Sequence, residues 1–99
     1  MIAGYSTSKH LLEERSDRLM RIATTVGFGE IAYKKPLQKA DGWAVITTTG
    51  VLLVTDRHDS FIVTMYLVDI EQLMAIFEGN PPKEIKKIVK ENMKKGYVR

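Results

Sequence analysis

Three strand-like segments joined by very short connections most constrain how this chain can fold. They span residues 43–48, 51–55 and 61–67, and they are rich in β-branched and aromatic residues. Thr49-Gly50 forms the first connection, and a polar turn over 56–60 forms the second. Connections this short predict an antiparallel meander, because a parallel crossover needs a dozen or more residues. A candidate strand over 30–34, which Pro36 ends, brings the expected sheet to four strands.

A helical pattern precedes the predicted sheet. Ser8 is a good N-cap, and apolar residues then recur at three- and four-residue spacings until Gly27 and Gly29. Ser16-Asp17 either sits on the wet side of one helix or caps a second one, since both side chains compete for backbone partners. The segment 8–26 is therefore one helix or two.

Two further helices are predicted after the sheet. Asp69 and Gln72 form a capping pair for a helix that Gly79 ends, and the next helix begins after Asn80-Pro81 and ends at Gly96. The apolar stripes expected to be buried are Ile70, Leu73, Met74 and Phe77 in the first helix and Ile85, Ile88, Val89 and Met93 in the second. The order predicts an α+β fold: an N-terminal helix or helix pair on a four-stranded antiparallel meander, then two C-terminal helices, with helices covering one face of the sheet.

The length of 99 residues fits a single domain, with an α+β core over 1–68 and a helical extension over 69–99. The absence of cysteine excludes disulfides, thiolate nucleophiles and cysteine-based zinc sites. Neither a signal peptide nor a run of about 18 apolar residues is visible, so we expect a cytoplasmic protein with no membrane contact. No glycine-rich phosphate loop, nucleophile elbow or His-Glu-x-x-His helix occurs, which argues against nucleotide-driven motors, triad hydrolases and zinc proteases.

Charge is distributed unevenly along the chain, although the net charge is only +3. Residues 83–99 hold seven basic and two acidic residues, whereas residues 1–82 hold eight basic and ten acidic residues. The basic C-terminal segment either meets phosphates or is simply the solvated face of an amphipathic helix.

Two groups of ionisable residues are candidates for metal or phosphate chemistry. His10, Glu14 and Asp17 share one helix face, where they could bind a divalent metal, or where Glu14 could orient the imidazole as a general base. The alternative is a solvated surface pair. The run from Asp56 to Asp59 suits a metal or phosphate contact and equally suits an exposed hairpin tip.

Alternation along the last strand separates two faces. Phe61, Val63, Met65 and Leu67 form a fully apolar face, which predicts core, and Ile62, Thr64 and Tyr66 form the other. The hydroxyls of Thr64 and Tyr66 could stand on an open sheet surface that RNA contacts, or they could merely suit a half-buried strand.

Basic residues form two candidate phosphate-binding sets. Arg15, Arg18 and Arg21 follow helical spacing and could form a ridge that contacts phosphates. Arg15 also falls on the apolar stripe, so it needs a partner. Lys34 and Lys35, with Lys39, add a basic patch before Trp43, for which solubility is the alternative explanation.

A family resemblance follows from three short motifs: Ser8-Lys9-His10 with Glu14-Arg15 and Arg18, then Gly50 to Thr55, then Phe61 to Tyr66. Over about residues 6 to 68 the chain resembles the small RelE-like domains of the barnase–EndoU–colicin–RelE group, which are metal-independent ribonuclease folds found in toxins and in phage or mobile-element proteins. The resemblance implies helices on a four-stranded antiparallel sheet with an RNA cleft on its open face.

The same resemblance implies roles for individual residues. His10 would be the acid or base, Arg15 would steady the phosphate, and Thr64 and Tyr66 would line the site. No cofactor is expected, because RNA supplies its own nucleophile, the 2′-hydroxyl, and the protein supplies a proton acceptor, a proton donor and a cation. Expected partners are RNA and a neutralising protein. The C-terminal helices extend past the family's core and either cover the sheet or form a homodimer contact.

Three functional hypotheses remain open from the sequence. The first is a small ribonuclease-like protein, and the second is a non-enzymatic module that binds nucleic acid or protein. The third is a phage-type regulatory or structural protein that dimerises through residues 70–93. Convergence of His10, Arg15 and Tyr66 in one cleft would favour the first, and their separation would favour the second.

Overall fold

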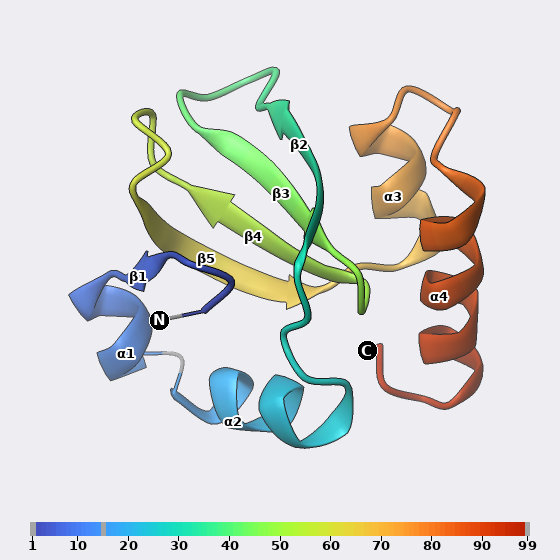
Figure 1. Cartoon of the computed structure of the whole chain (residues 1–99), viewed down its shortest axis with the longest axis horizontal. Helices are drawn as coiled ribbons and strands as arrows, with labels where there is room; N and C mark the ends of the chain where they lie inside the picture. The colour runs from blue at the N-terminus through green and yellow to red at the C-terminus, as the bar shows by residue number, and fades with distance from the viewer. Residues whose placement is uncertain (1, 15, 99) are drawn as a thin grey trace.

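The computed structural model describes residues 2–14 and 16–98 of the chain. In these residues, five strands and four helices follow one another (Figure 1). The N-terminal elements are β1 (Ser6–Thr7), α1 (Lys9–Glu14) and α2 (Ser16–Thr25). The remaining elements are β2 (Ile31–Pro36), β3 (Trp43–Thr47), β4 (Val51–Thr55), β5 (Phe61–Leu67), α3 (Ile70–Ile76) and α4 (Lys83–Lys94). Within the segment 8–26, the structure describes helix on both sides of residue 15, as α1 and α2.

The sheet contains the predicted meander and one strand more. Its order is β1-β5-β4-β3-β2, in which β2 to β5 pair antiparallel and β1 pairs parallel with β5. The fold is therefore α+β with a five-stranded mixed sheet. A strand of only two residues has no periodicity, which is why the sequence does not reveal β1.

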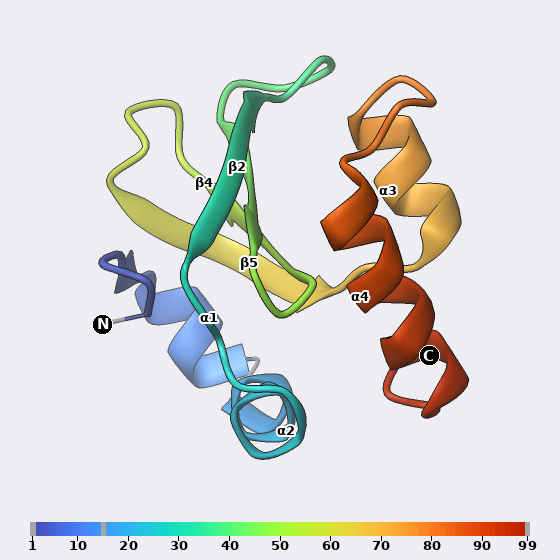
Figure 2. The ribbon, with the colours of Figure 1, turned by 45° about the vertical axis from the view of Figure 1, so that its right-hand side comes forward.

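Helices cover both faces of this sheet, so the expectation of one covered face is wrong. Val45 and Leu53 pack with Leu11 of α1 and Ile22 of α2, whereas the neighbouring strand residues face α3 and α4. That second core contains Ala44, Ile46, Leu52, Val68, Leu73, Ile85 and Val89. Figure 2 shows α1 and α2 on one side of the sheet and α3 and α4 on the other. Leu73, Ile85 and Val89 of the predicted stripes are thus buried within the chain.

A bulge in β5 changes which of its side chains enter the core. Thr64 lies opposite Val54, but Ile62 lies opposite the next residue, Thr55, so Val63 is left without a partner. The bulge turns Ile62 into the core beside Met65 and leaves Phe61 and Val63 exposed. The predicted fully apolar face is therefore wrong at its first two positions and correct at Met65 and Leu67.

Side-chain caps begin two of the helices where the sequence predicts them. The Ser8 hydroxyl accepts a hydrogen bond from the Leu11 backbone N–H at 3.1 Å. Asp69 and Gln72 form a reciprocal capping box, with distances of 2.8 and 3.0 Å between side chain and backbone.

The turn between β3 and β4 ties three parts of the fold together. Thr47 is fully buried, and its hydroxyl accepts from the Thr49 and Val51 backbone N–H groups. The Thr49 hydroxyl donates to the Gly27 carbonyl after α2 at 2.8 Å, and the Asn92 amide of α4 donates to the Thr49 carbonyl at 2.9 Å. Gly50 has a φ of 85°, and a Cβ there would lie 2.8 Å from the Asn92 amide nitrogen. Only glycine fits this close approach.

Asn92 therefore takes a buried position that the sequence analysis gave to Met93. Asn92 is 6% exposed and Met93 is 42% exposed. In residues 2–14 and 16–98, no helix is long and apolar enough to cross a membrane.

The link between α4 and the β3–β4 turn can be tested by substitution. We expect Asn92→Ala to lower the free energy of unfolding by about 1–3 kcal/mol, because the half-buried Thr49 carbonyl loses its donor. The adjacent exposed substitution Met93→Ala should change it by less than about 0.5 kcal/mol. Urea denaturation of both variants measures the difference, and equal effects would contradict the role given to Asn92.

Candidate functional site

A polar cleft lies along the part of β5 that β1 does not cover. β1 pairs only with Phe61 and Ile62, so the rest of this edge faces α2 and the chain after α4. The cleft has a volume of about 510 Å³, within the range of ligand-binding pockets. Its lining residues come from four elements and the C-terminal segment: Glu14, Asp17, Arg18, Arg21, Ile22, Tyr66, Leu67, Gln72 and Tyr97.

Two arginines of α2 stand three positions apart on the helix face that borders the cleft. Arg18 donates from Nη1 to the Met65 carbonyl at 3.2 Å, and Arg21 donates from Nη2 to the Tyr97 carbonyl. These main-chain oxygens fix the guanidinium groups without neutralising their charge, and each group keeps further N–H donors. In the described part of the chain, neither arginine has a carboxylate oxygen within 4 Å.

Aromatic and acidic side chains complete the lining. Tyr66 at the end of β5 and Tyr97 after α4 are both half-buried. Gln72 comes from the first turn of α3, and Glu14 and Asp17 are exposed acceptors on the α1–α2 side. The cleft therefore offers cations, aromatic surface and hydrogen-bond acceptors together, which suits a ligand carrying both negative charge and N–H donors.

Of the candidate site residues that the sequence singled out, five meet here: Glu14, Asp17, Arg18, Arg21 and Tyr66. His10 is exposed on α1 and does not line the cleft, and neither does Thr64, which is half-buried opposite Val54. Arg15 lies outside the described residues.

Lys34 and Lys35 lie on β2, at the other edge of the sheet from the cleft. Because they are consecutive in a strand, their side chains point to opposite faces. The Lys34 ammonium pairs with Asp59 and lies 5.6 Å from the Tyr5 ring centre, and the Lys35 ammonium lies 5.1 Å from that of Phe77. The predicted lysine patch is thus split between two local environments.

Sequence reasoning missed Tyr97 and Gln72 as cleft residues. Gln72 carries a recognisable signal, but that signal is for helix capping and says nothing about the side of the helix that faces a ligand. Tyr97 follows the glycine that ends α4, and only the tertiary contact with Arg21 brings it to the cleft. Neighbours distant in sequence leave no local pattern.

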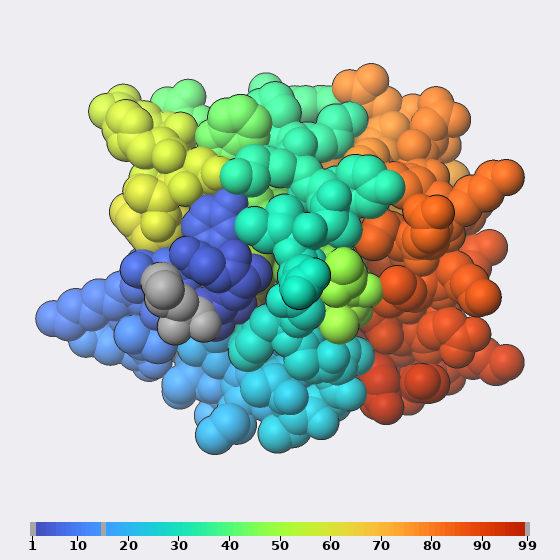
Figure 3. All heavy atoms as spheres, viewed as in Figure 1, coloured from blue at the N-terminus to red at the C-terminus, as the bar shows by residue number. Residues whose placement is uncertain are grey.

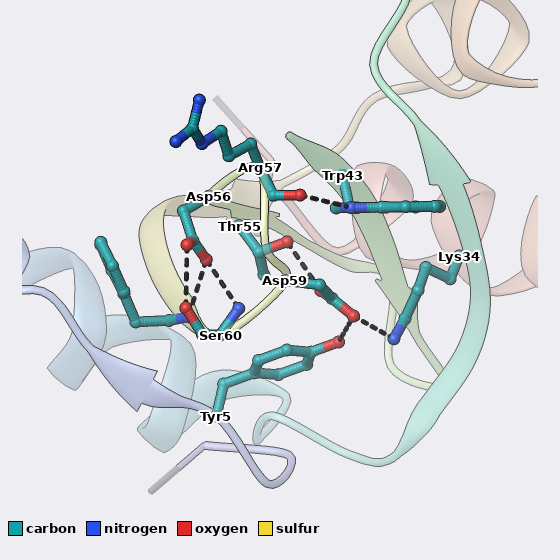
Figure 4. Close-up of polar contacts among 9 residues, drawn as sticks. Tyr5, Lys34, Trp43, Thr55, Asp56, Arg57, Asp59 and Ser60 are labelled. Atoms are coloured by element: carbon teal, nitrogen blue, oxygen red, sulfur yellow. Dashed lines mark hydrogen bonds and ion pairs between the residues drawn. The ribbon is translucent and has the colours of Figure 1, made fainter. Parts of the chain in front are cut away.

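The turn between β4 and β5 uses its carboxylates to hold structure (Figure 4). Asp59 has a φ of 54° and accepts hydrogen bonds from the Thr55 hydroxyl at 2.8 Å and the Tyr5 hydroxyl at 3.0 Å, in addition to the Lys34 pair. Asp59 therefore links β2 with the segment that precedes β1. Strands β1 and β2 stand at opposite edges of the sheet. Burial opposes ionisation of Asp59, but the Lys34, Thr55 and Tyr5 donors outweigh it and lower its pKa.

Asp56 caps the same turn. Its carboxylate accepts from the Ser60 backbone N–H at 2.6 Å, the Ser60 hydroxyl at 2.8 Å and the Phe61 N–H at 3.0 Å. Desolvation raises the pKa of Asp56, but these hydrogen bonds outweigh it and lower the pKa from 3.8 to about 2. The run 56–59 thus forms a structured hairpin tip.

Neither proposed ligand group for a divalent metal comes together. In the described ranges, 2–14 and 16–98, no three His, Asp or Glu side chains are arranged so that they could hold a metal ion. His10, Glu14 and Asp17 do not form such a group, and neither do the ionisable residues of the β4–β5 turn.

Comparisons of the chain with protein-family models, curated proteins and solved structures find no match.

The low pKa of Asp56 predicts how acid affects stability. Because the folded state favours the ionised carboxylate, its contribution is present above the ordinary pKa of 3.8 and is lost as pH falls through about 2. As the pH is lowered from 3.8 to about 2, the urea concentration at the unfolding midpoint should therefore fall less steeply for Asp56→Asn than for the wild type. Parallel curves for the two proteins would show that the turn is not a source of acid sensitivity.

Proposed function

We propose that this protein binds single-stranded RNA and that the cleft between α2 and β5 receives a nucleotide. The proposal rests on one observation: two arginines and two tyrosines line the same concave surface. Among the described residues, neither arginine belongs to an ion pair. A nucleotide combines the matching groups, because it has an anionic phosphate, a flat base and polar base edges.

The arginines supply the phosphate contact. Guanidinium groups bind phosphate through charge-assisted, often bidentate, hydrogen bonds. The carbonyls of Met65 and Tyr97 hold Arg18 and Arg21 in place before a ligand arrives, so less side-chain entropy is lost on binding.

The remaining lining suits a base. Tyrosine rings stack on unpaired bases, and Tyr66 and Tyr97 are the aromatic residues of the cleft. Glu14 and Asp17 can accept hydrogen bonds from the amino groups of base edges. The Gln72 oxygen is used in the capping box, but its amide N–H groups can donate to base carbonyls and ring nitrogens. A concave site of this kind admits a base only when it is splayed out of a helix, which favours single-stranded RNA over a duplex.

Ribonuclease activity, as the RelE-like resemblance implies, is the second candidate. It is supported by the position of Tyr66, a proton donor, in the same cleft as Arg18 and Arg21. His10 would then act from outside the cleft lining. An RNA-degradation assay that compares wild type with His10→Ala tests this candidate: a general acid or base at His10 predicts cleavage about 10²–10⁴-fold slower in the variant. Equal cleavage rates would exclude His10.

Binding is tested with a fluorescently labelled single-stranded RNA of mixed sequence and fluorescence anisotropy. Arg18→Gln and Arg21→Gln each remove a positive charge but retain an N–H donor for the main-chain carbonyl. We expect each to weaken RNA binding about 10- to 100-fold, the effect of losing a hydrogen bond to a charged group.

Lys39→Gln is the matched control, because it removes one positive charge from an exposed position that does not line the cleft. Its affinity should stay close to that of the wild type. If all three variants bind RNA as the wild type does, or if the wild type does not bind it, the cleft is not an RNA site.

A further inference from the structure

The outer face of α4 carries a row of lysines that the cleft does not use. Ile85, Val89 and Asn92 are the buried residues of this helix, and they fix which side faces the sheet. Lys83, Lys87, Lys90 and Lys94 recur at the i, i+4, i+7 and i+11 positions of one face, and all four are exposed. The row, called the lysine stripe below, is about 16 Å long at a rise of 1.5 Å per residue.

The lysine stripe lies opposite the buried side of α4. The helical repeat of 100° per residue places its four members within about 50° of the direction pointing away from the core. Figures 1 and 3 show α4 at the margin of the molecule, with side chains of this segment (orange to red) protruding from it. Nothing in the described chain covers this face.

The positive charge of the stripe is not neutralised locally. The two glutamates of α4, Glu84 and Glu91, lie together on one flank of the helix, and Lys86 lies on the other. In the described ranges, no carboxylate oxygen lies within 4 Å of an α4 lysine nitrogen. The stripe therefore presents a continuous positive surface to an anionic partner.

The stripe also leads toward the cleft. Lys94 ends α4, and three residues later Tyr97 lines the cleft, where Arg21 holds its carbonyl. In Figure 1 the C-terminal segment lies between α2 and α4. An extended polyanion seated in the cleft thus has a basic path leaving it along α4.

We propose that the lysine stripe of α4 is a second RNA contact, which binds the phosphates of the strand flanking the nucleotide in the cleft. This inference rests on the proposed RNA-binding function. The stripe provides contacts that depend on charge and not on base identity, so it adds affinity and salt dependence without sequence preference.

An anionic membrane surface is the less suitable partner for the same charges. A helix that lies on a membrane inserts an apolar face beside its basic one. The apolar residues Ile85 and Val89 are already buried against the sheet, and Met93 is the large hydrophobic residue of α4 that is exposed. RNA phosphates need no such apolar face.

The test measures how RNA affinity depends on salt. Each phosphate contact on a single strand contributes about 0.7 to the slope of log K against log salt. The double variant Lys87→Gln/Lys90→Gln should therefore lower that slope by about 1.4 and weaken binding about 10- to 30-fold at about 0.1 M salt. The matched double variant Lys9→Gln/Lys39→Gln removes the same charge from exposed positions elsewhere and should retain the wild-type slope.

A dinucleotide probe separates the two contacts, because it is too short to reach from the cleft along α4. The stripe variant should bind it as the wild type does, whereas Arg21→Gln should bind it more weakly. If the stripe variant and its control bind the long RNA with the same slope, the stripe is not an RNA contact, whatever the cleft does.

Two other outcomes are equally decisive. If the stripe variant loses long-RNA binding while Arg18→Gln and Arg21→Gln retain it, the stripe stands and the cleft proposal fails. If vesicles containing phosphatidylserine bind the wild type but not the stripe variant, and long-RNA affinity is the same in both, the partner is a membrane and the inference is overturned.

Discussion

Burial of β3 and β4 on both faces is the constraint on which the other elements depend. Val45 and Leu53 need apolar cover on one side, and Ala44, Ile46 and Leu52 need it on the other. Burying these side chains contributes about 25 cal/mol for each Å² of apolar surface removed from water. A sheet with helices on one face only would leave half of them exposed. Helices α1 and α2 therefore take one face, α3 and α4 take the other, and polar chemistry is confined to edges and outer helix surfaces.

The cleft occurs where this arrangement leaves a strand edge uncovered. An exposed strand edge presents unpaired backbone groups, which favour pairing with other chains. Here Arg18 donates to the Met65 carbonyl of that edge, so one residue both satisfies the strand and stands ready for an anion. Arg21 does the same for Tyr97 at the C-terminal segment. The arginines are therefore part of the fold as well as of the candidate site.

Local signals in the sequence were sufficient for the elements but not for their arrangement. The Ser8 cap and the Asp69–Gln72 box follow from interactions within a few residues, and the structure confirms both. The predicted four-stranded meander is matched in part, as β2 to β5 of a five-stranded mixed sheet. The second covered face does have a signal: residues 43–46 and 51–54 are continuously apolar where a half-exposed strand would alternate. The bulge at Val63 has none, because it arises from how β5 must fit both β4 and the core.

The candidate site shows the same division more sharply. Arg18 and Arg21 could be chosen from the sequence because their spacing puts them on one helix face, and Tyr66 because it alternates with core residues. His10 follows the same helical logic, yet it stays on the surface away from the cleft, because its neighbour Leu11 is the side chain that enters the core. Helical spacing predicts which residues share a face of a helix. The direction in which that face points depends on which residue of the helix is buried in the core. The same principle places the lysines of α4 outward, since Ile85 and Val89 fix its orientation against the sheet.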